Sequence, residues 1–129
     1  MRWAALTLAA ALALGAAPAG AAATAAGVRA EIDALLARLQ ASDCQFGRNG
    51  TWYAGTEAKD HLLRKLSAIE GRTTVASTEQ FIELAASRSS TTGRPYAVRC
   101  AAQAATPSQQ WLTQQLTVLR AAKPGAAPR

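Results

Sequence analysis

The side chains best suited to chemistry in this sequence lie in two stretches near its middle. His61 is the only histidine, and Glu57 precedes it by one helical turn. A hydroxyl-rich stretch, SRSSTTGRPY at residues 87–96, follows and contains Ser89 and Ser90. A histidine base, a serine nucleophile and an orienting carboxylate are the parts of a hydrolytic site. One hypothesis is therefore a hydrolase that uses His61 and a loop serine.

Other interpretations of these residues compete with catalysis. Glu57 and His61 make an ordinary i, i+4 helix contact as readily as a catalytic one, and the sequence contains no strand-turn-helix nucleophile motif. A histidine that hydrogen-bonds at a packing edge needs no activity. A metal site needs three or four ligands, and this region offers only Glu57, His61 and Asp60. We therefore predict no catalytic residue, no metal site and no cofactor.

A binding surface accounts for more of these side chains than catalysis does. Arginine, amide and hydroxyl groups supply hydrogen-bond donors and a tyrosine supplies an aromatic face, which suits carboxylates, sugars or a protein partner. The opposing interpretation is a scaffold, in which the Ser/Thr run caps a helix and a glycine turns the chain. The predicted binding residues are Arg48, Asn49, His61, Lys65, Ser89, Ser90, Gly93, Arg94 and Tyr96.

Helical periodicity predicts the elements that position these side chains. Apolar residues spaced three and four apart predict helices at about residues 25–41, 57–70, 78–87 and 107–122. In the second helix, Glu57, His61 and Lys65 form a polar stripe along the edge of the packed face. The expected end signals are Gly55-Thr56 and Gly71 for the second helix, a Ser77–Gln80 capping box for the third, and Thr106-Pro107 for the fourth.

Extended structure is predicted beside the candidate site. The pair Asn49-Gly50 suits a two-residue type I′ turn, which predicts a hairpin of Gln45–Arg48 against Thr51–Tyr53. Alternation over residues 96–100 predicts a further short strand. The predicted fold class is mainly α, of the α+β type, with about four helices and a small disulfide-linked β hairpin and strand element.

The first 23 residues have the pattern of a secretory signal peptide. Arg2 precedes an apolar run from Trp3 to Leu14, and small residues follow. Because a membrane span needs about 20 apolar residues, we expect cleavage after Ala21 or Ala23 and no stable membrane anchor. The sequence therefore predicts a periplasmic protein with a single small globular domain at 24–122 and a disordered tail at 123–129.

The cysteine count and the charge agree with an exported protein. Cys44 and Cys100 are the only cysteines, and in an oxidising compartment such a pair predicts a disulfide. The sequence carries 14 basic and 8 acidic residues, a net charge of +6. The basic residues are dispersed among the acids, so we expect no nucleic-acid partner. The expected partner is an envelope protein, a glycan or a carboxylate ligand.

An ordered set of short segments covers nearly all of the sequence after the signal segment. It consists of Cys44 with FGRNG at 46–50, WY at 52–53, EA at 57–58, HL at 61–62, KL at 65–66, TEQFI at 78–82, AS at 86–87, SS at 89–90, GRPY at 93–96 and Val98. This set resembles the YfeK-like family of small exported proteins of Gram-negative bacteria. Thr92 stands where that family's pattern has serine, a change that keeps the hydroxyl. The resemblance implies an exported single domain and carries no reaction, cofactor or partner.

These observations together predict a non-enzymatic binding module of the periplasm. Its recognition surface would join the Arg48-Asn49 turn to the Ser89–Tyr96 loop, with Tyr96 as the aromatic face. The alternatives are a cell-envelope hydrolase using His61 and a loop serine, or a purely structural scaffold. The recognition hypothesis predicts that Arg94→Ala and Tyr96→Ala remove binding while the melting temperature stays nearly unchanged.

Overall fold

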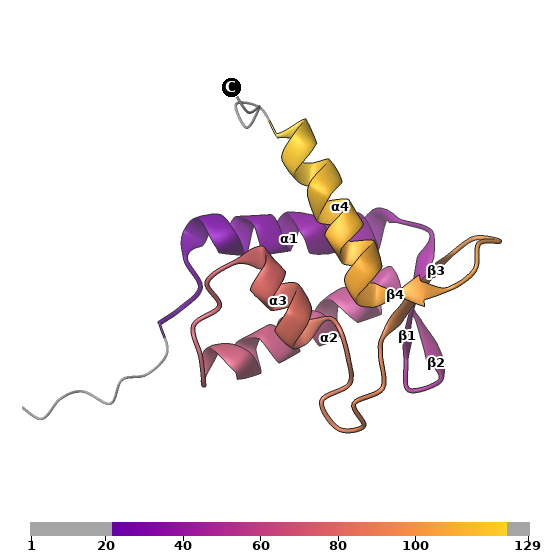
Figure 1. Cartoon of the computed structure of the whole chain (residues 1–129), viewed down its shortest axis with the longest axis horizontal. Coiled ribbons are helices and arrows are strands. Elements are labelled where there is room, and N and C mark those ends of the chain that lie inside the picture. The colour runs from indigo at the N-terminus through magenta and orange to yellow at the C-terminus, as the bar shows by residue number, and fades with distance from the viewer. Residues whose placement is uncertain (1–21, 124–129) are drawn as a thin grey trace, which may run out of the picture.

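The computed structural model describes residues 22–123, in which helices pack together with a small sheet at one end (Figure 1). Most of the predicted signal peptide (residues 1–21) and of the predicted tail (residues 124–129) lies outside the described residues. The helices are α1 (Ala26–Ala41), α2 (Gly55–Glu70), α3 (Thr78–Ala85) and α4 (Ser108–Ala122); the strands are β1 (Cys44–Arg48), β2 (Thr51–Ala54), β3 (Ala97–Cys100) and β4 (Thr106–Pro107). The predicted fold class is confirmed. Within residues 22–123, no helix is long and apolar enough to cross a membrane.

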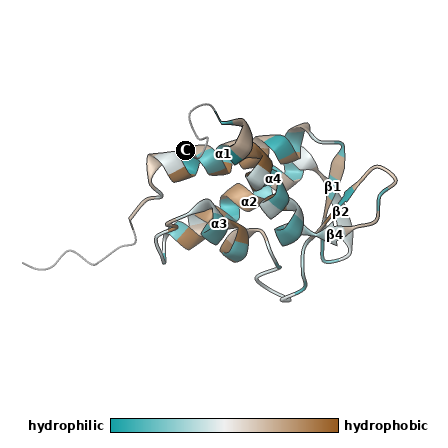
Figure 2. Cartoon of the chain, turned by 45° about the horizontal axis from the view of Figure 1, so that its top comes forward, coloured by the Kyte–Doolittle hydropathy of each residue, from teal (hydrophilic) through white to brown (hydrophobic). Residues whose placement is uncertain are grey.

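The core forms because each helix buries one apolar stripe. Figure 2 shows hydrophobic and hydrophilic residues alternating along the helices. Leu36 of α1, Leu62 of α2, Phe81 of α3 and Leu112 of α4 are all fully buried. Each such side chain stabilises the fold by roughly 1.5–3 kcal/mol relative to its exposed state. The core therefore fixes α2, which carries His61, and α3, which leads into the α3–β3 loop (residues 86–96).

Gly55 sets the close approach of α1 and α2. A Cβ atom at this position would lie 2.4 Å from the carbonyl oxygen of Leu39, so only glycine fits. Gly55 is the first residue of α2, and the preceding Ala54 makes no side-chain cap hydrogen bond. The interpretation of Gly55-Thr56 as a cap was wrong, because the glycine serves helix packing instead.

The sheet is antiparallel, with the strand order β2-β1-β3-β4. Asn49 and Gly50 have φ angles of 49° and 84°, which confirms the predicted hairpin turn. Cys44 and Cys100 are direct cross-strand partners, and their sulfur atoms are 1.97 Å apart. The predicted disulfide is confirmed, and it joins β1 to β3 at one end of their pairing.

The two faces of this sheet have different surroundings because side chains alternate along each strand. The inner face, which packs toward the helices, carries Phe46, Arg48, Tyr53 and Val98. The outer face carries Gln45, Gly47, Trp52 and Arg99.

Two predicted helix ends differ from those observed. Thr106-Pro107 was expected to open the fourth helix, but it pairs with β3 as strand β4, and α4 starts at Ser108 without a side-chain cap. The predicted helix start is thus displaced by one residue, because Thr106 and Pro107 pair with β3. The backbone N–H of Ser108 donates to the carbonyl of Tyr96 at 2.8 Å, which joins α4 to the start of β3.

The third helix begins as predicted and ends earlier. Its N-cap Ser77 accepts a hydrogen bond from the backbone N–H of Gln80 at 3.1 Å. The Gln80 side chain accepts from the N–H of Ala76, one residue before the cap, so the capping box is shifted. The helix ends at Ala85 rather than at residue 87, and the Ser87 hydroxyl donates to the carbonyl of Ile82 at 2.7 Å.

Candidate functional site

Most of the predicted binding residues come together around one pocket, the polar pocket, between α2, the β1–β2 turn and the α3–β3 loop. Its volume is about 250 Å³. The residues that line it are Arg48, Asn49, His61, Lys65, Ser89, Ser90, Thr91 and Tyr96. Thr91 also lines the pocket, and it belongs to the Ser89–Tyr96 loop of the predicted recognition surface. Gly93 and Arg94 were predicted but do not line the pocket.

Ser89 organises the loop that forms one side of the polar pocket. Its hydroxyl oxygen lies 3.3 Å from the backbone nitrogens of both Thr91 and Thr92, and its own backbone atoms pair with Gly93 and Arg94 at 2.9 Å. Gly93 has a φ of 72°, which allows the chain to reverse there. Ser89 is buried, at 4% exposed. The loop is therefore held in shape by its own hydrogen bonds.

Asn49 connects this loop to the hairpin turn. Its side-chain nitrogen donates to the Ser89 hydroxyl at 3.3 Å, and its side-chain oxygen accepts from the Thr92 hydroxyl at 2.7 Å. Both polar atoms of the amide are thus used across the two segments. The predicted neighbourhood of the Arg48-Asn49 turn and the loop is confirmed by these contacts.

A chain of hydrogen bonds crosses the inner wall of the polar pocket. Nη1 of Arg48 lies 2.7 Å from Nδ1 of His61, and because a guanidinium only donates, Nδ1 is the acceptor. The proton of the neutral ring is then on Nε2, which donates to the Tyr96 hydroxyl at 3.1 Å. Nζ of Lys65 donates to the same hydroxyl at 3.0 Å and to the carbonyl of Arg88 at 2.8 Å. The Tyr96 oxygen therefore accepts two hydrogen bonds.

Burial and nearby positive charges shift the pKa values of His61, Lys65 and Tyr96. Burial, followed by the charges of Arg48, Lys65 and Arg64, lowers the pKa of His61 to about 4 from its ordinary 6.5. His61 is thus neutral at pH 7, in agreement with its role as the acceptor for Arg48. Burial and then Arg48 also lower the pKa of Lys65 below its ordinary value, whereas burial raises the pKa of Tyr96.

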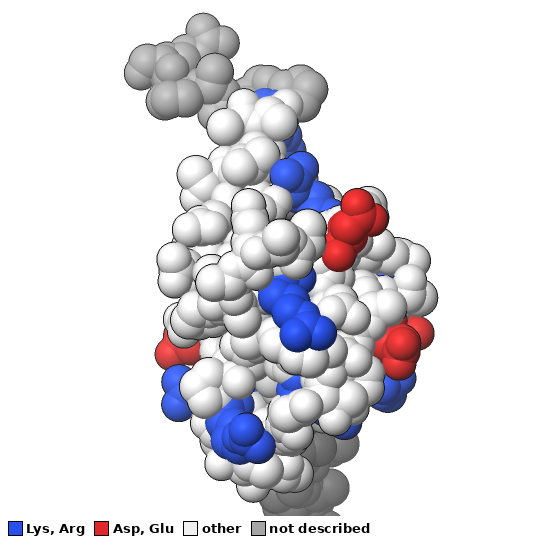
Figure 3. Space-filling model, turned by 90° about the vertical axis from the view of Figure 1, so that its right-hand side faces the viewer, with Lys and Arg blue, Asp and Glu red and all other residues white. Residues whose placement is uncertain are grey.

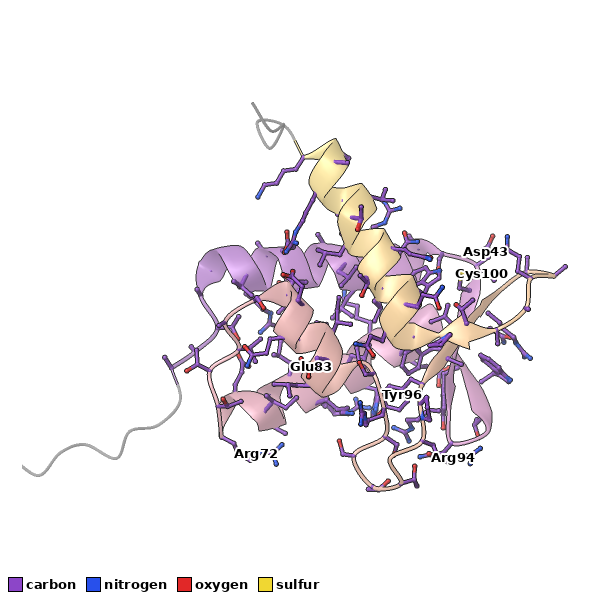
Figure 4. All side chains as sticks on the ribbon, viewed as in Figure 1. Asp43, Arg72, Glu83, Arg94, Tyr96 and Cys100 are labelled. Carbon is purple, nitrogen blue, oxygen red and sulfur yellow. A yellow bond between two sulfur atoms is a disulfide. The ribbon has the colours of Figure 1, made fainter. Side chains whose placement is uncertain are left out.

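Tyr96 is the principal correction to the predicted site. It was expected to present an exposed aromatic face, but only 1% of it is exposed. Its ring packs against Phe46 at 5.0 Å, and Lys65 Nζ lies 4.7 Å from the ring centroid. Figure 4 shows Tyr96 turned into the molecule and Arg94 at the outside of the loop. Tyr96 therefore contributes its hydroxyl to the pocket, while its ring belongs to the core.

In the described part of the chain, the parts of the hypothetical hydrolytic site are not joined to one another by hydrogen bonds, although His61, Ser89 and Ser90 line the same pocket. Within residues 22–123, no hydrogen bond joins His61 to Glu57, Ser89 or Ser90, because Arg48 and Tyr96 take both ring nitrogens. Glu57 instead lines a second pocket of about 110 Å³, which also has Arg48 and His61 in its wall. Over the same described range, no three His, Cys, Asp or Glu side chains are grouped to hold a metal ion.

The family model that matches this chain covers residues 26–120, from the start of α1 to near the end of α4. The chain belongs to this family. It is described as a family of unknown function (DUF5329). The matched range includes every residue of the polar pocket, so the pocket is part of the family domain.

A curated relative of the chain is an uncharacterized protein, YfeK, from Salmonella typhimurium. The two sequences are 46% identical over 68 residues, which are 52% of this chain and 55% of the relative. The chain thus spans about half the length of that relative. The resemblance to YfeK-like proteins is confirmed. No solved structure matches this chain.

Proposed function

We propose that this chain is an exported, periplasmic binding module whose polar pocket binds a carboxylate group of its ligand. The observation that carries the proposal is the double acceptance at Tyr96. Because its oxygen accepts hydrogen bonds from both His61 and Lys65, the proton of its own hydroxyl is left to donate to a ligand. A buried donor of this kind gains from an acceptor that arrives in the pocket.

The charge around the polar pocket supports an anionic ligand group. Arg48 and Lys65 bring two positively charged side chains to the wall, and no Asp or Glu is among the described residues that line the pocket. Hydrogen bonds from cationic donors to a carboxylate are about twice as strong as those between neutral groups. Hydroxyls of Ser90 and Thr91 complete the lining and suit sugar or peptide groups beside the carboxylate.

Export is the second part of the proposal. The apolar segment at residues 3–14 with its basic start and small-residue end supports a cleavable signal peptide. The Cys44–Cys100 disulfide supports an oxidising compartment, because such bonds form and persist there. In the periplasm, carboxylates occur on envelope peptides and on acidic sugars, which are the ligand classes to test first.

The test is an NMR titration of the oxidised protein with two sugars that differ in one group. N-acetylmuramic acid carries a carboxylate, and N-acetylglucosamine is its uncharged counterpart. We expect the acid alone to shift the backbone resonances of residues 48–49 and 89–91. Equal shifts from both sugars, or none from either, would argue against carboxylate recognition.

Two substitutions locate the binding in the polar pocket. Tyr96→Phe keeps the buried ring and removes only the hydroxyl, and Lys65→Gln removes the charge. Each should weaken binding by about tenfold to a hundredfold, in line with a charge-assisted hydrogen bond of about 1.5–3 kcal/mol. Lys59→Gln is the matched control, because Lys59 lies on the same helix and donates to Gln40 away from the pocket. A Lys65→Gln protein that binds as tightly as the Lys59→Gln protein would contradict the proposal.

A further inference from the structure

The outer face of the sheet carries an arrangement that the polar pocket does not use. The side chains of Gln45, Trp52 and Arg99 come from three adjacent strands and meet above Gly47. They lie on the side of the sheet opposite to the inner-face residues Phe46 and Arg48. Any role for this arrangement is therefore separate from binding in the polar pocket.

Gly47 lets the indole of Trp52 lie against the strand. The two residues are cross-strand partners, and a Cβ on Gly47 would approach ring atoms of Trp52 to between 2.9 and 3.1 Å. These distances are shorter than nearly all contacts that real Cβ atoms make, so a larger residue would displace the ring. The absence of a side chain on Gly47 thus makes room for the indole of Trp52, which is half-buried.

Arg99 is held in one orientation over this ring. Its guanidinium carbon is 4.0 Å from a ring centroid of Trp52, and its Nε donates to the side-chain oxygen of Gln45 at 2.9 Å. Among residues 22–123, Arg99 makes no other side-chain hydrogen bond or ion pair, which leaves the Nη edge of its fork for a ligand. The disulfide joins β1 to β3 at the residue pair next to Gln45 and Arg99. The side chain is ordered before any partner arrives, which lowers the entropy cost of binding.

The charge around this face favours an acidic partner. None of the four strands in the described part of the chain contains an Asp or Glu. Figure 3 views this end of the molecule and shows a basic side chain near the middle of the face, with acidic side chains above it and to either side. A guanidinium fork pairs with a carboxylate through two parallel hydrogen bonds. A neutral sugar would instead need a ring face of Trp52 that Arg99 already covers.

We propose that the outer face, with Trp52 and Arg99 at its centre, is a docking surface for an acidic segment of a partner protein. A carboxylate of that segment pairs with the free edge of Arg99, and its neighbouring atoms pack on the indole of Trp52. Tryptophan and arginine dominate the energetics of protein interfaces when they are ordered and close together. A protein segment can contact both the guanidinium of Arg99 and the indole of Trp52, whereas a polyanionic glycan would use the charge of Arg99 alone.

The experiment titrates the oxidised, isotope-labelled chain with an N-acetylated tetraglutamate peptide and follows the indole N–H of Trp52 and the Nε–H of Arg99 by NMR. Tetraglutamine is the uncharged control peptide, and heparin is the glycan control. We expect tetraglutamate to shift both resonances and tetraglutamine to leave them unchanged. Equal shifts with tetraglutamine, no shift with tetraglutamate, or tighter binding of heparin than of the peptide would each overturn the proposal.

Variants then separate geometry from charge and from the polar pocket. Arg99→Lys keeps the charge and loses the fork, and it should weaken tetraglutamate binding at least fivefold; Gln45→Ala frees the guanidinium and should weaken it by a smaller factor. Arg29→Lys is the matched control, on an exposed arginine of α1 that pairs with Asp33, and should bind like the unmodified protein. Lys65→Gln changes only the polar pocket, so it should leave the tetraglutamate-induced shifts of the Trp52 and Arg99 resonances unchanged. Equal affinities of the Arg99→Lys and Arg29→Lys proteins would overturn the proposal.

Discussion

The two faces of the sheet each place an arginine beside an aromatic ring, but they do so in different environments. On the inner face, Arg48 lies 5.4 Å from the ring centroid of Tyr53 and also donates to His61 of α2. On the outer face, Arg99 stacks on Trp52 and its Nε donates to Gln45 within the sheet. The inner arginine therefore depends on helix packing for its position, and the outer one depends on the sheet alone.

This difference shows how one small sheet can support two independent surfaces. Alternation of side chains sends neighbouring residues of β1, such as Gly47 and Arg48, to opposite sides. Changes in α2 should alter the inner face and leave the outer face intact, while changes at Gly47 should do the reverse.

Removal of the disulfide should weaken both faces together. The Cys44→Ala/Cys100→Ala double variant loses a link with a sequence separation of 56. On the chain-entropy model, we expect the free energy of unfolding to fall by about 4 kcal/mol, measured by urea denaturation. A fall of less than about 1 kcal/mol would show that strand pairing and helix packing hold β1 to β3 without the covalent link.

Gly55→Ala should disturb the inner face through helix packing. The added Cβ meets the backbone carbonyl of Leu39 rather than a movable side chain, so α1 and α2 must separate. We expect a loss of about 3 kcal/mol in the free energy of unfolding and a shift of the His61 resonances. Gly27→Ala is the control: a Cβ there meets nothing within 4 Å, and stability should stay unchanged or rise by up to about 1 kcal/mol. Similar losses in both variants would contradict the packing role of Gly55.

Gly47→Ala should disturb the outer face alone. The new Cβ displaces the Trp52 ring, and the stack with Arg99 is lost. We expect a loss of about 1 kcal/mol in stability and a changed indole N–H resonance of Trp52. The His61 resonances should stay where they are. If His61 moves and Trp52 does not, the independence of the two faces is wrong.

Titration of His61 tests the inner face at a single group. The imidazolium form of His61 should lose its proton with a midpoint of about pH 4, well below the ordinary pKa of 6.5. The causes are burial and the charges of Arg48, Lys65 and Arg64. Between these values the unfolded chain binds a proton that the folded chain does not, so stability should decrease as the pH falls from 6.5 to about 4. The measurements are the His61 Cε1–H shift and urea unfolding at several pH values, with His61→Gln expected to flatten the profile. A midpoint near 6.5 would contradict the burial of His61 and its hydrogen bond with Arg48.

Local signals in the sequence were enough to predict the hairpin and the disulfide. Features that depend on contacts between distant segments, such as strand β4, could not be predicted from them. Asn49-Gly50 specifies its turn through backbone angles that few residues adopt, so the hairpin followed directly. Thr106-Pro107 carries a helix-start signal just as clear, and the helix begins at the next residue, but Thr106 and Pro107 themselves pair with Val98 and Ala97 as strand β4. A local pattern cannot show which distant segment will compete for the same backbone groups.

The candidate site followed the same division. The predicted neighbourhood of Asn49 and Ser89 rests on a turn, a loop and a disulfide that the sequence specifies, and the structure places them in contact. Tyr96 was misplaced even though it alternates with the buried Val98, which put its ring on the core side of the strand. The burial was not predicted because a tyrosine counts as a polar residue, although it can bury its ring and still present its hydroxyl to a pocket. The pairing of His61 with Arg48 left no local signal, since the two residues lie on different elements.

All the residues that line the polar pocket lie between Cys44 and Cys100 in the sequence. The disulfide therefore closes a covalent ring around the site. A single proteolytic cut at the exposed residues 90–94 of the α3–β3 loop would leave both pieces joined through the two sulfur atoms. In a compartment that contains proteases, such a nicked protein would keep its parts together and would separate into fragments only after reduction.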